Sequence, residues 1–230
     1  MFGHTYSKSP SMSNLKASIL CFTLSLAFSA VASAQDHSCT LNAGGGWSPA
    51  VGKEGSNLNA GWNFQAGGGF ALTEAPKPGH EWSFFLTANF MYDDLAVSQS
   101  ALQTARTLNT TNVGLLAATS GIAKFYTLTL DPTFRFPVGQ RANVYVLGGF
   151  GFFRRDLQFS GSTTEGSLLQ PVSQTVFGSG GNSGGFDAGG GVNFKLANTG
   201  LMVYAEARVV HGLGINTSNT LIPISAGIRW

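Results

Sequence analysis

The last eleven residues of the chain, 220–230, alternate between apolar and polar side chains with a period of two. Read as a strand, this segment has an apolar face made of Ile222, Ile224, Ala226, Ile228 and Trp230. Arg229 falls on the opposite face. An apolar strand face that finishes on an aromatic residue is typical of membrane β-barrels, whose outer surface contacts lipid and whose strand ends carry aromatic girdles. The segment therefore predicts a closing strand with Ile228 and Trp230 at the membrane interface and Arg229 inside the barrel.

The same alternation recurs along the rest of the chain and predicts eight strands in total. Their expected ranges are residues 40–47, 59–72, 81–92, 122–136, 142–153, 186–195, 201–210 and 220–230. In nearly every range one face is apolar, while the other holds Gly, Thr, Asn and the charged residues. A lipocalin-like soluble barrel would have the opposite arrangement. The pattern predicts an all-β fold, an eight-stranded antiparallel up-and-down transmembrane β-barrel.

The connections between these strands alternate between long and short. Residues 93–121 and 155–185 are rich in Ser, Thr, Gly and Asn and are predicted to be long loops, although Ala101, Ala105 and Leu108 could form a short helical piece. Residues 137–140 are predicted to form a tight turn. Because outer-membrane barrels have short periplasmic turns and longer outer loops, we expect the two long loops to face outward and to offer a site for an extracellular ligand.

Composition and the N-terminus agree with an exported membrane protein. Charged residues make up only 10% of the chain, against about 25% in ordinary soluble domains. Residues 1–34 read as a cleaved signal peptide ending in Ala-Ser-Ala, which leaves residues 35–230 as the barrel domain; the alternatives are an uncleaved helical anchor and a start at Met12. Cleavage removes Lys8 and Lys16 and leaves 11 basic residues (13 − 2) against 11 acidic ones, so nucleic-acid binding is not expected. Cys39 is then the only thiol, so no intramolecular disulfide can form.

Seven charged residues fall on the faces that point into the predicted barrel. This lumen charge network consists of Asp131, Arg135, Asp187, Lys195, Glu206, Arg208 and Arg229. Charges can be buried in a narrow lumen when opposite signs are matched. We therefore expect the three acids to pair with the bases inside the barrel.

With these residues laid out, the chain resembles the small eight-stranded bacterial outer-membrane β-barrel superfamily, of the OmpA, OmpX and opacity-protein type. The resemblance covers residues 39–230 and rests on the strand pattern, the terminal Ile-Arg-Trp and the segment 203–208, Val-Tyr-Ala-Glu-Ala-Arg. It implies a location in the cell outer membrane, contact with outer-membrane lipid and insertion by the barrel-assembly machinery. No peptidoglycan-binding domain is expected after the barrel.

No motif in the sequence predicts catalysis, a cofactor or a metal. The glycine triplets at 44–46, 67–69 and 189–191 lack the following Lys-Ser/Thr of a phosphate loop. Lipid A deacylases of the outer membrane suggest one alternative, in which Glu206, His211 and Ser218 would form a hydrolase site; Leu213 stands where those enzymes have their serine. A narrow small-solute pore is a further alternative. The sequence favours a structural or surface-interaction role without catalysis.

Overall fold

The computed structural model describes residues 39–73, 82–109, 116–163, 174–196, 199–214 and 218–230, which belong to one compact unit, Ser38–Trp230. The expected signal peptide lies outside the described residues. No helix in these ranges is long and apolar enough to cross a membrane.

Strands dominate the described chain, with two short helices between them. The strands are β1 (Cys39–Ser48), β2 (Ala50–Val51), β3 (Gly61–Ala71), β4 (Ser83–Ala96), β5 (Leu116–Val138), β6 (Ala142–Thr163), β7 (Gln174–Lys195), β8 (Met202–Leu213), β9 (Ser218–Leu221) and β10 (Ile224–Arg229). The helices are the 3-10 helix η1 (Gly52–Ser56) and the α-helix α2 (Gln99–Asn109). The turn between β5 and β6 contains Gly139 at a φ of 74°, a conformation that glycine adopts without strain.

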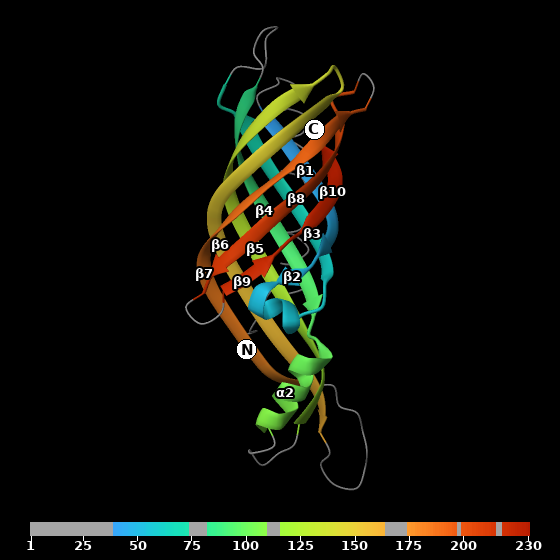
Figure 1. Ribbon diagram of the computed structural model, residues 1–230, viewed down its shortest axis with the longest axis vertical. Coiled ribbons are helices and arrows are strands. Elements are labelled where there is room, and N and C mark those ends of the chain that lie inside the picture. Colours follow the sequence, from blue (N-terminus) through green and yellow to red (C-terminus); the bar gives the residue numbers. More distant parts are fainter. Residues whose placement is uncertain (1–38, 74–81, 110–115, 164–173, 197–198, 215–217) are drawn as a thin grey trace, which may run out of the picture. The chain divides into compact units, whose positions relative to one another are not determined.

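The strands pair in an antiparallel ring (Figure 1). Each strand from β3 to β8 pairs with its neighbour in the chain, and β10 pairs with both β1 and β8, which closes the ring. Pro49 separates β1 from β2, and Ile222 and Pro223 separate β9 from β10. Proline has no N–H to donate to a ladder, so the predicted closing strand 220–230 is interrupted at Pro223. β1 and β2 together occupy one position in the ring, and β9 and β10 together occupy another. The ten strands therefore fill eight positions, and the predicted eight-stranded barrel is confirmed.

The two predicted long loops are wrong in extent. Much of 93–121 belongs to β4, α2 and β5, and much of 155–185 belongs to β6 and β7. Backbone pairing continues as far as Leu116 with Thr163 and Gly161 with Gln174. These outer segments have no lipid on one face, so their sequence lacks the apolar alternation that identified the other strands.

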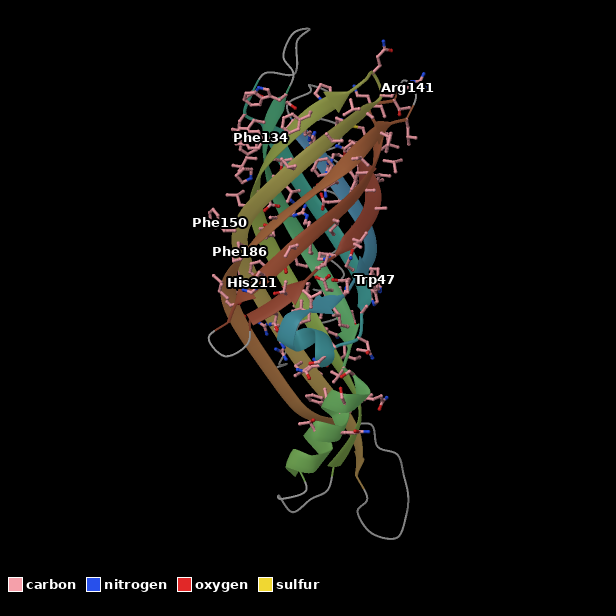
Figure 2. The ribbon with its side chains drawn as sticks, in the orientation of Figure 1. Trp47, Phe134, Arg141, Phe150, Phe186 and His211 are labelled. Carbon is pink, nitrogen blue, oxygen red and sulfur yellow. The ribbon has the colours of Figure 1, made fainter. Side chains whose placement is uncertain are left out.

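The two faces of the ring differ as the alternation predicted. Buried positions along the strands are mainly Thr, Asn, Ser and charged residues, whereas large exposed side chains are aromatic or aliphatic. Phe85 and Met91 break the alternation, and both point inward, with exposed fractions of 7% and 1%. In Figure 2 the side chains of Phe134, Phe150 and Phe186 lie on the outside of the ring. The described barrel is therefore polar inside and apolar outside.

Candidate functional site: the barrel lumen and the extended sheet

Arg208 of β8 lies at the centre of the barrel lumen, surrounded by three carboxylates. Its Nη1 is 2.9 Å from Oδ2 of Asp131 and 3.0 Å from Oδ2 of Asp187, and its Nε is 2.5 Å from Oε1 of Glu206. All four side chains are almost fully buried. Because β5, β7 and β8 each supply at least one of these groups, the ion pairs connect three strands across the lumen.

Neutral side chains complete the hydrogen bonding of these carboxylates. Tyr145 donates its hydroxyl to Oε2 of Glu206 over 2.7 Å. Asn89 and Thr129 both donate to Oδ2 of Asp131, over 2.7 and 3.0 Å. Buried charges are tolerated when they are paired and hydrogen-bonded in this way, and the side chains involved occupy the middle of the lumen.

Glycines on the inward face make room for these side chains. A Cβ built on Gly149 would lie 2.3 Å from Oδ1 of Asp131, and one built on Gly191 would lie 2.6 Å from the hydroxyl of Tyr145. Gly148, the residue before Gly149, faces outward, and its Cβ would meet no atom closer than 3.5 Å. At this adjacent pair, packing therefore requires the inward glycine, Gly149, and leaves room for a side chain at the outward one, Gly148.

This asymmetry gives a matched pair of substitutions. We expect Gly149→Ala to displace Asp131 and to destabilise the barrel by roughly 1–3 kcal/mol, as overpacked cores are. Gly148→Ala should change the stability by less than about 0.5 kcal/mol, as surface substitutions do. Urea unfolding of both variants in detergent micelles measures the difference, and equal stabilities would contradict the packing argument.

The remaining charged residues that the sequence assigned to the lumen differ in their partners. Arg229 donates to Oδ1 of Asn193 over 2.7 Å, and its Nη2 lies 3.9 Å from Oε2 of Glu206. Arg135 is buried but bonds to no acid; it donates to Thr40 Oγ1 over 3.3 Å. Lys195 is exposed, and its backbone N–H donates to the carbonyl of Arg141 near the β5–β6 turn. Assigning Lys195 to the lumen was therefore wrong, because the alternation of β7 continues past the depth at which its side chains are enclosed.

An apolar cluster closes the lumen near α2. It consists of Leu58, Met91, Leu95, Val97, Leu102, Ala123, Phe125, Phe153, Val210 and Leu221. The segment after η1 is tied to the end of β4, since Asn59 donates its N–H to the carbonyl of Ala96 and Ser98 donates its hydroxyl to the carbonyl of Ser56. Leu102 reaches the cluster from the first turns of α2. The lumen is thus polar in its middle and apolar at the α2 end.

Aromatic side chains mark two edges of the outer apolar surface. Near the α2 end, the ring centroids of Trp62 and Tyr92 are 5.3 Å apart and those of Tyr92 and Tyr126 are 5.2 Å apart. Near the short-turn end, the rings of Phe84 and Phe134 are 4.7 Å apart. The stretch of β5 from Tyr126 to Phe136 spans roughly 25 Å along the barrel axis at the usual rise and tilt, which is the height of an outer-membrane apolar band. Ile228, 43% exposed, lies on this surface.

Three strands continue well beyond the aromatic edge at the α2 end. The last β4–β5 pair is Ala96 with Ile122, and the last β7–β8 pair is Gly185 with Gly212. Beyond these pairs, β5, β6 and β7 form a three-stranded extended sheet, visible in Figure 1 as the strands that run past the others toward α2. Within the described chain, residues 174–184 of β7 pair with β6 on one side only. They contain no proline and no charged residue.

Glu206 and His211, two of the three residues considered for a hydrolase, do not come together. The Glu206 carboxylate lies in the lumen among Arg208 and Tyr145. His211 instead stacks on Phe186, with ring centroids 5.1 Å apart, and its Nδ1 lies 2.8 Å from Oγ1 of Thr220. The side chain of Ser218 lies outside the described residues. The described residues also contain no group of three or more His, Cys, Asp or Glu side chains that could hold a metal ion.

The sequence of the chain matches a family whose description agrees with this ring, its polar lumen and its apolar band. Residues 19–228 match the family described as outer membrane protein β-barrel domain. The chain belongs to this family. It is therefore an outer-membrane protein, and the predicted superfamily and location are confirmed. A search of curated protein sequences finds no match.

Several solved structures of outer-membrane proteins align with most of this chain. Neisserial surface protein A (NspA) aligns with a TM-score of 0.52 and 16% identity, over 83% of this chain and 95% of that chain. Ail, the attachment invasion locus protein of Yersinia pestis, gives 0.46 and 13%, over 84% and 97%. A major outer membrane protein from Thermus thermophilus gives 0.45 and 14%, over 84% and 98%. At such identities the likeness to NspA shows the fold and nothing more about function.

Sequence reasoning missed the apolar cluster at the α2 end and the extended sheet. Leu58, Val97 and Leu102 lie in segments without a clear period, so nothing in their spacing marked them as buried. The one available signal was the group of helix-compatible residues around Ala101. Because the helical periodicity of that segment is weak, the pattern predicted a loop there.

Proposed function

We propose that this outer-membrane barrel is a surface-interaction protein without catalytic activity, which binds an extended segment of another polypeptide through its β5–β7 sheet. The observation that carries the proposal is the open edge of β7 at residues 174–184. An unpaired strand presents a row of N–H and C=O groups, and an added strand can pair with them. Proteins usually protect such an edge with Lys or Pro, and this segment has neither.

The faces of the sheet beside this edge are also open. A Cβ built on Gly181 or on Gly184 would meet no atom within 4 Å. Side chains of an incoming strand would therefore have space on the sheet faces, and main-chain hydrogen bonds would supply most of the affinity. Since outer-membrane barrels carry their longer connections on the cell surface, the sheet would face the exterior.

The filled lumen supports an interaction role over the pore alternative. The Arg208 ion pairs occupy the middle of the lumen, and the apolar cluster with Leu58, Leu95 and Leu102 covers the α2 end. An eight-stranded barrel is in any case only wide enough for its own side chains. Against the hydrolase alternative stands the separation of Glu206 from His211.

Fluorescent extended peptides added to intact cells test both the binding mode and the orientation. Cells producing the protein should retain peptides from a random library more strongly than cells without it. Two variants carry proline at adjacent positions, Gly180→Pro and Gly181→Pro. The variant whose lost N–H points to the open edge should stay folded and should no longer retain the peptides. Successive strand residues direct their N–H groups to opposite sides, so one variant loses only an open-edge donor and the other loses a bond to β6.

Two results would reject the proposal. Retention that survives in both folded proline variants would exclude the β7 edge as the binding surface. A change in the mass of lipid A that depends on the protein would instead establish the hydrolase alternative. We expect lipid A to be unchanged.

A further inference from the structure

Arg135 is the buried cation of the described lumen that has no carboxylate partner. Its exposed fraction is 6%, and its Nε has no hydrogen-bond partner. The guanidinium lies over the ring of Phe85, 3.8 Å from the centroid, and donates one bond to Thr40. One face and one edge are thus occupied, and Nε, on another edge, is buried without a hydrogen-bond partner.

The other charges of the lumen do not neutralise Arg135. The carboxylates of Asp131, Asp187 and Glu206 are bound to Arg208, and Glu206 is also the acid closest to Arg229. The electrostatic neighbours of Arg135 are Arg229, whose positive charge repels it, and Tyr145. The short-turn half of the lumen therefore carries an excess of positive charge, while three acids gather around one arginine nearer the middle.

A buried charge without a counter-charge is costly, and such groups are normally paired. We propose that the lumen binds a small inorganic anion, such as chloride or phosphate, at Arg135. The unpartnered Nε–H lies in the plane of the guanidinium, where oxyanions and halides are bound. This inference is independent of the proposed function at the β7 edge.

The position of Arg135 determines how the anion enters. Arg135 pairs with Ser83, the first residue of β4, so it lies close to the short-turn end of the ring. Thr40 beside it is only half-buried, so solvent lies nearer to Arg135 on this side than on the other. On the other side, Thr133, Asp131 and Asn89 fill the lumen with buried, hydrogen-bonded side chains. The anion would therefore bind from the short-turn side and would not pass through the barrel.

Anion-dependent thermal unfolding tests the inference. The refolded wild-type protein, in a non-ionic detergent at constant ionic strength, is titrated with chloride or phosphate in place of gluconate, a larger anion. Above the dissociation constant the midpoint should rise by about 4 °C for each tenfold increase in the anion. Arg135→Gln should lose this rise. In gluconate alone it should be at least as stable as the wild type, because the substitution removes an unpaired buried charge.

Arg141→Gln is the matched control, since Arg141 is exposed at the β5–β6 turn near the same end of the barrel (Figure 2). This variant should keep the full anion response. Equal midpoints in chloride and gluconate for the wild type, or an unchanged response in folded Arg135→Gln, would overturn the proposal. If Arg135→Gln does not refold, the site is tested on the wild-type protein by the width of the chloride-35 NMR signal. The folded protein should broaden this signal, and added phosphate should reverse the broadening. No broadening would reject the site.

Discussion

Replacing Arg208 with glutamine is expected to destabilise the barrel more than any other single substitution in its lumen. The change leaves Asp131, Asp187 and Glu206 buried beside one another without the cation that contacts all three. Removing one partner of a buried ion pair costs roughly 3–5 kcal/mol, and here one removal affects three carboxylates. Urea unfolding in micelles should show the loss, and the folded band on an unheated electrophoresis gel should weaken at lower temperature than in the wild type.

Neutralising the acids should restore part of this loss. Combining Arg208→Gln with Asp131→Asn and Asp187→Asn removes the repulsion and keeps the shapes of the side chains. Lys195→Gln is the matched control because Lys195 is exposed at the end of β7, and it should leave stability unchanged. A stable Arg208→Gln variant would show that the ion pairs at the centre of the lumen contribute little to the fold.

The part of the fold that lies in the membrane could be predicted from the sequence because the lipid and the lumen impose opposite requirements on successive residues. Val203, Ala205 and Val209 had to be apolar, and Glu206 and Arg208 between them had to be enclosed with partners. The alternation therefore identified both faces of β8 and the ring itself. The same rule placed Asp131, Asp187 and Arg229 inward.

Outside the apolar band this requirement disappears, and sequence reasoning lost accuracy there. The outer parts of β5, β6 and β7 are held by backbone pairing, which depends little on the side chains, so residues such as Ser120 and Asn182 carried no strand signal. Alternation also says nothing about depth or about partners across the lumen. For that reason Lys195, which is exposed, was assigned to the lumen charge network. Arg135 was expected to pair with an acid, but its hydrogen-bond partner is Thr40.

Deleting Trp230 should leave the folded barrel only slightly less stable but sharply reduce the amount inserted in cells. In the structure Trp230 pairs with β1 at the ring closure: its N–H donates to the carbonyl of Leu41 over 2.9 Å, and the N–H of Leu41 donates to Trp230 over 2.7 Å. Losing two such bonds costs about 1–3 kcal/mol. Refolding into detergent should therefore succeed.

Insertion in cells places a different demand on the same residue. Before the ring closes, β10 is an unpaired edge that another protein can recognise by strand addition. We propose that the barrel-assembly machinery binds this edge and recognises Trp230, the residue that follows β10. Trp230→Phe should preserve insertion, since an aromatic ring remains. Trp82→Ala removes a different tryptophan, which is exposed at the short-turn end next to Phe134, without altering the terminal strand. The amounts of the three variants inserted in the membrane separate recognition from anchoring. If Trp230 is recognised, only its deletion should lower the inserted amount. Equal losses in the deletion and in Trp82→Ala would show that Trp230 is only an anchor at the interface.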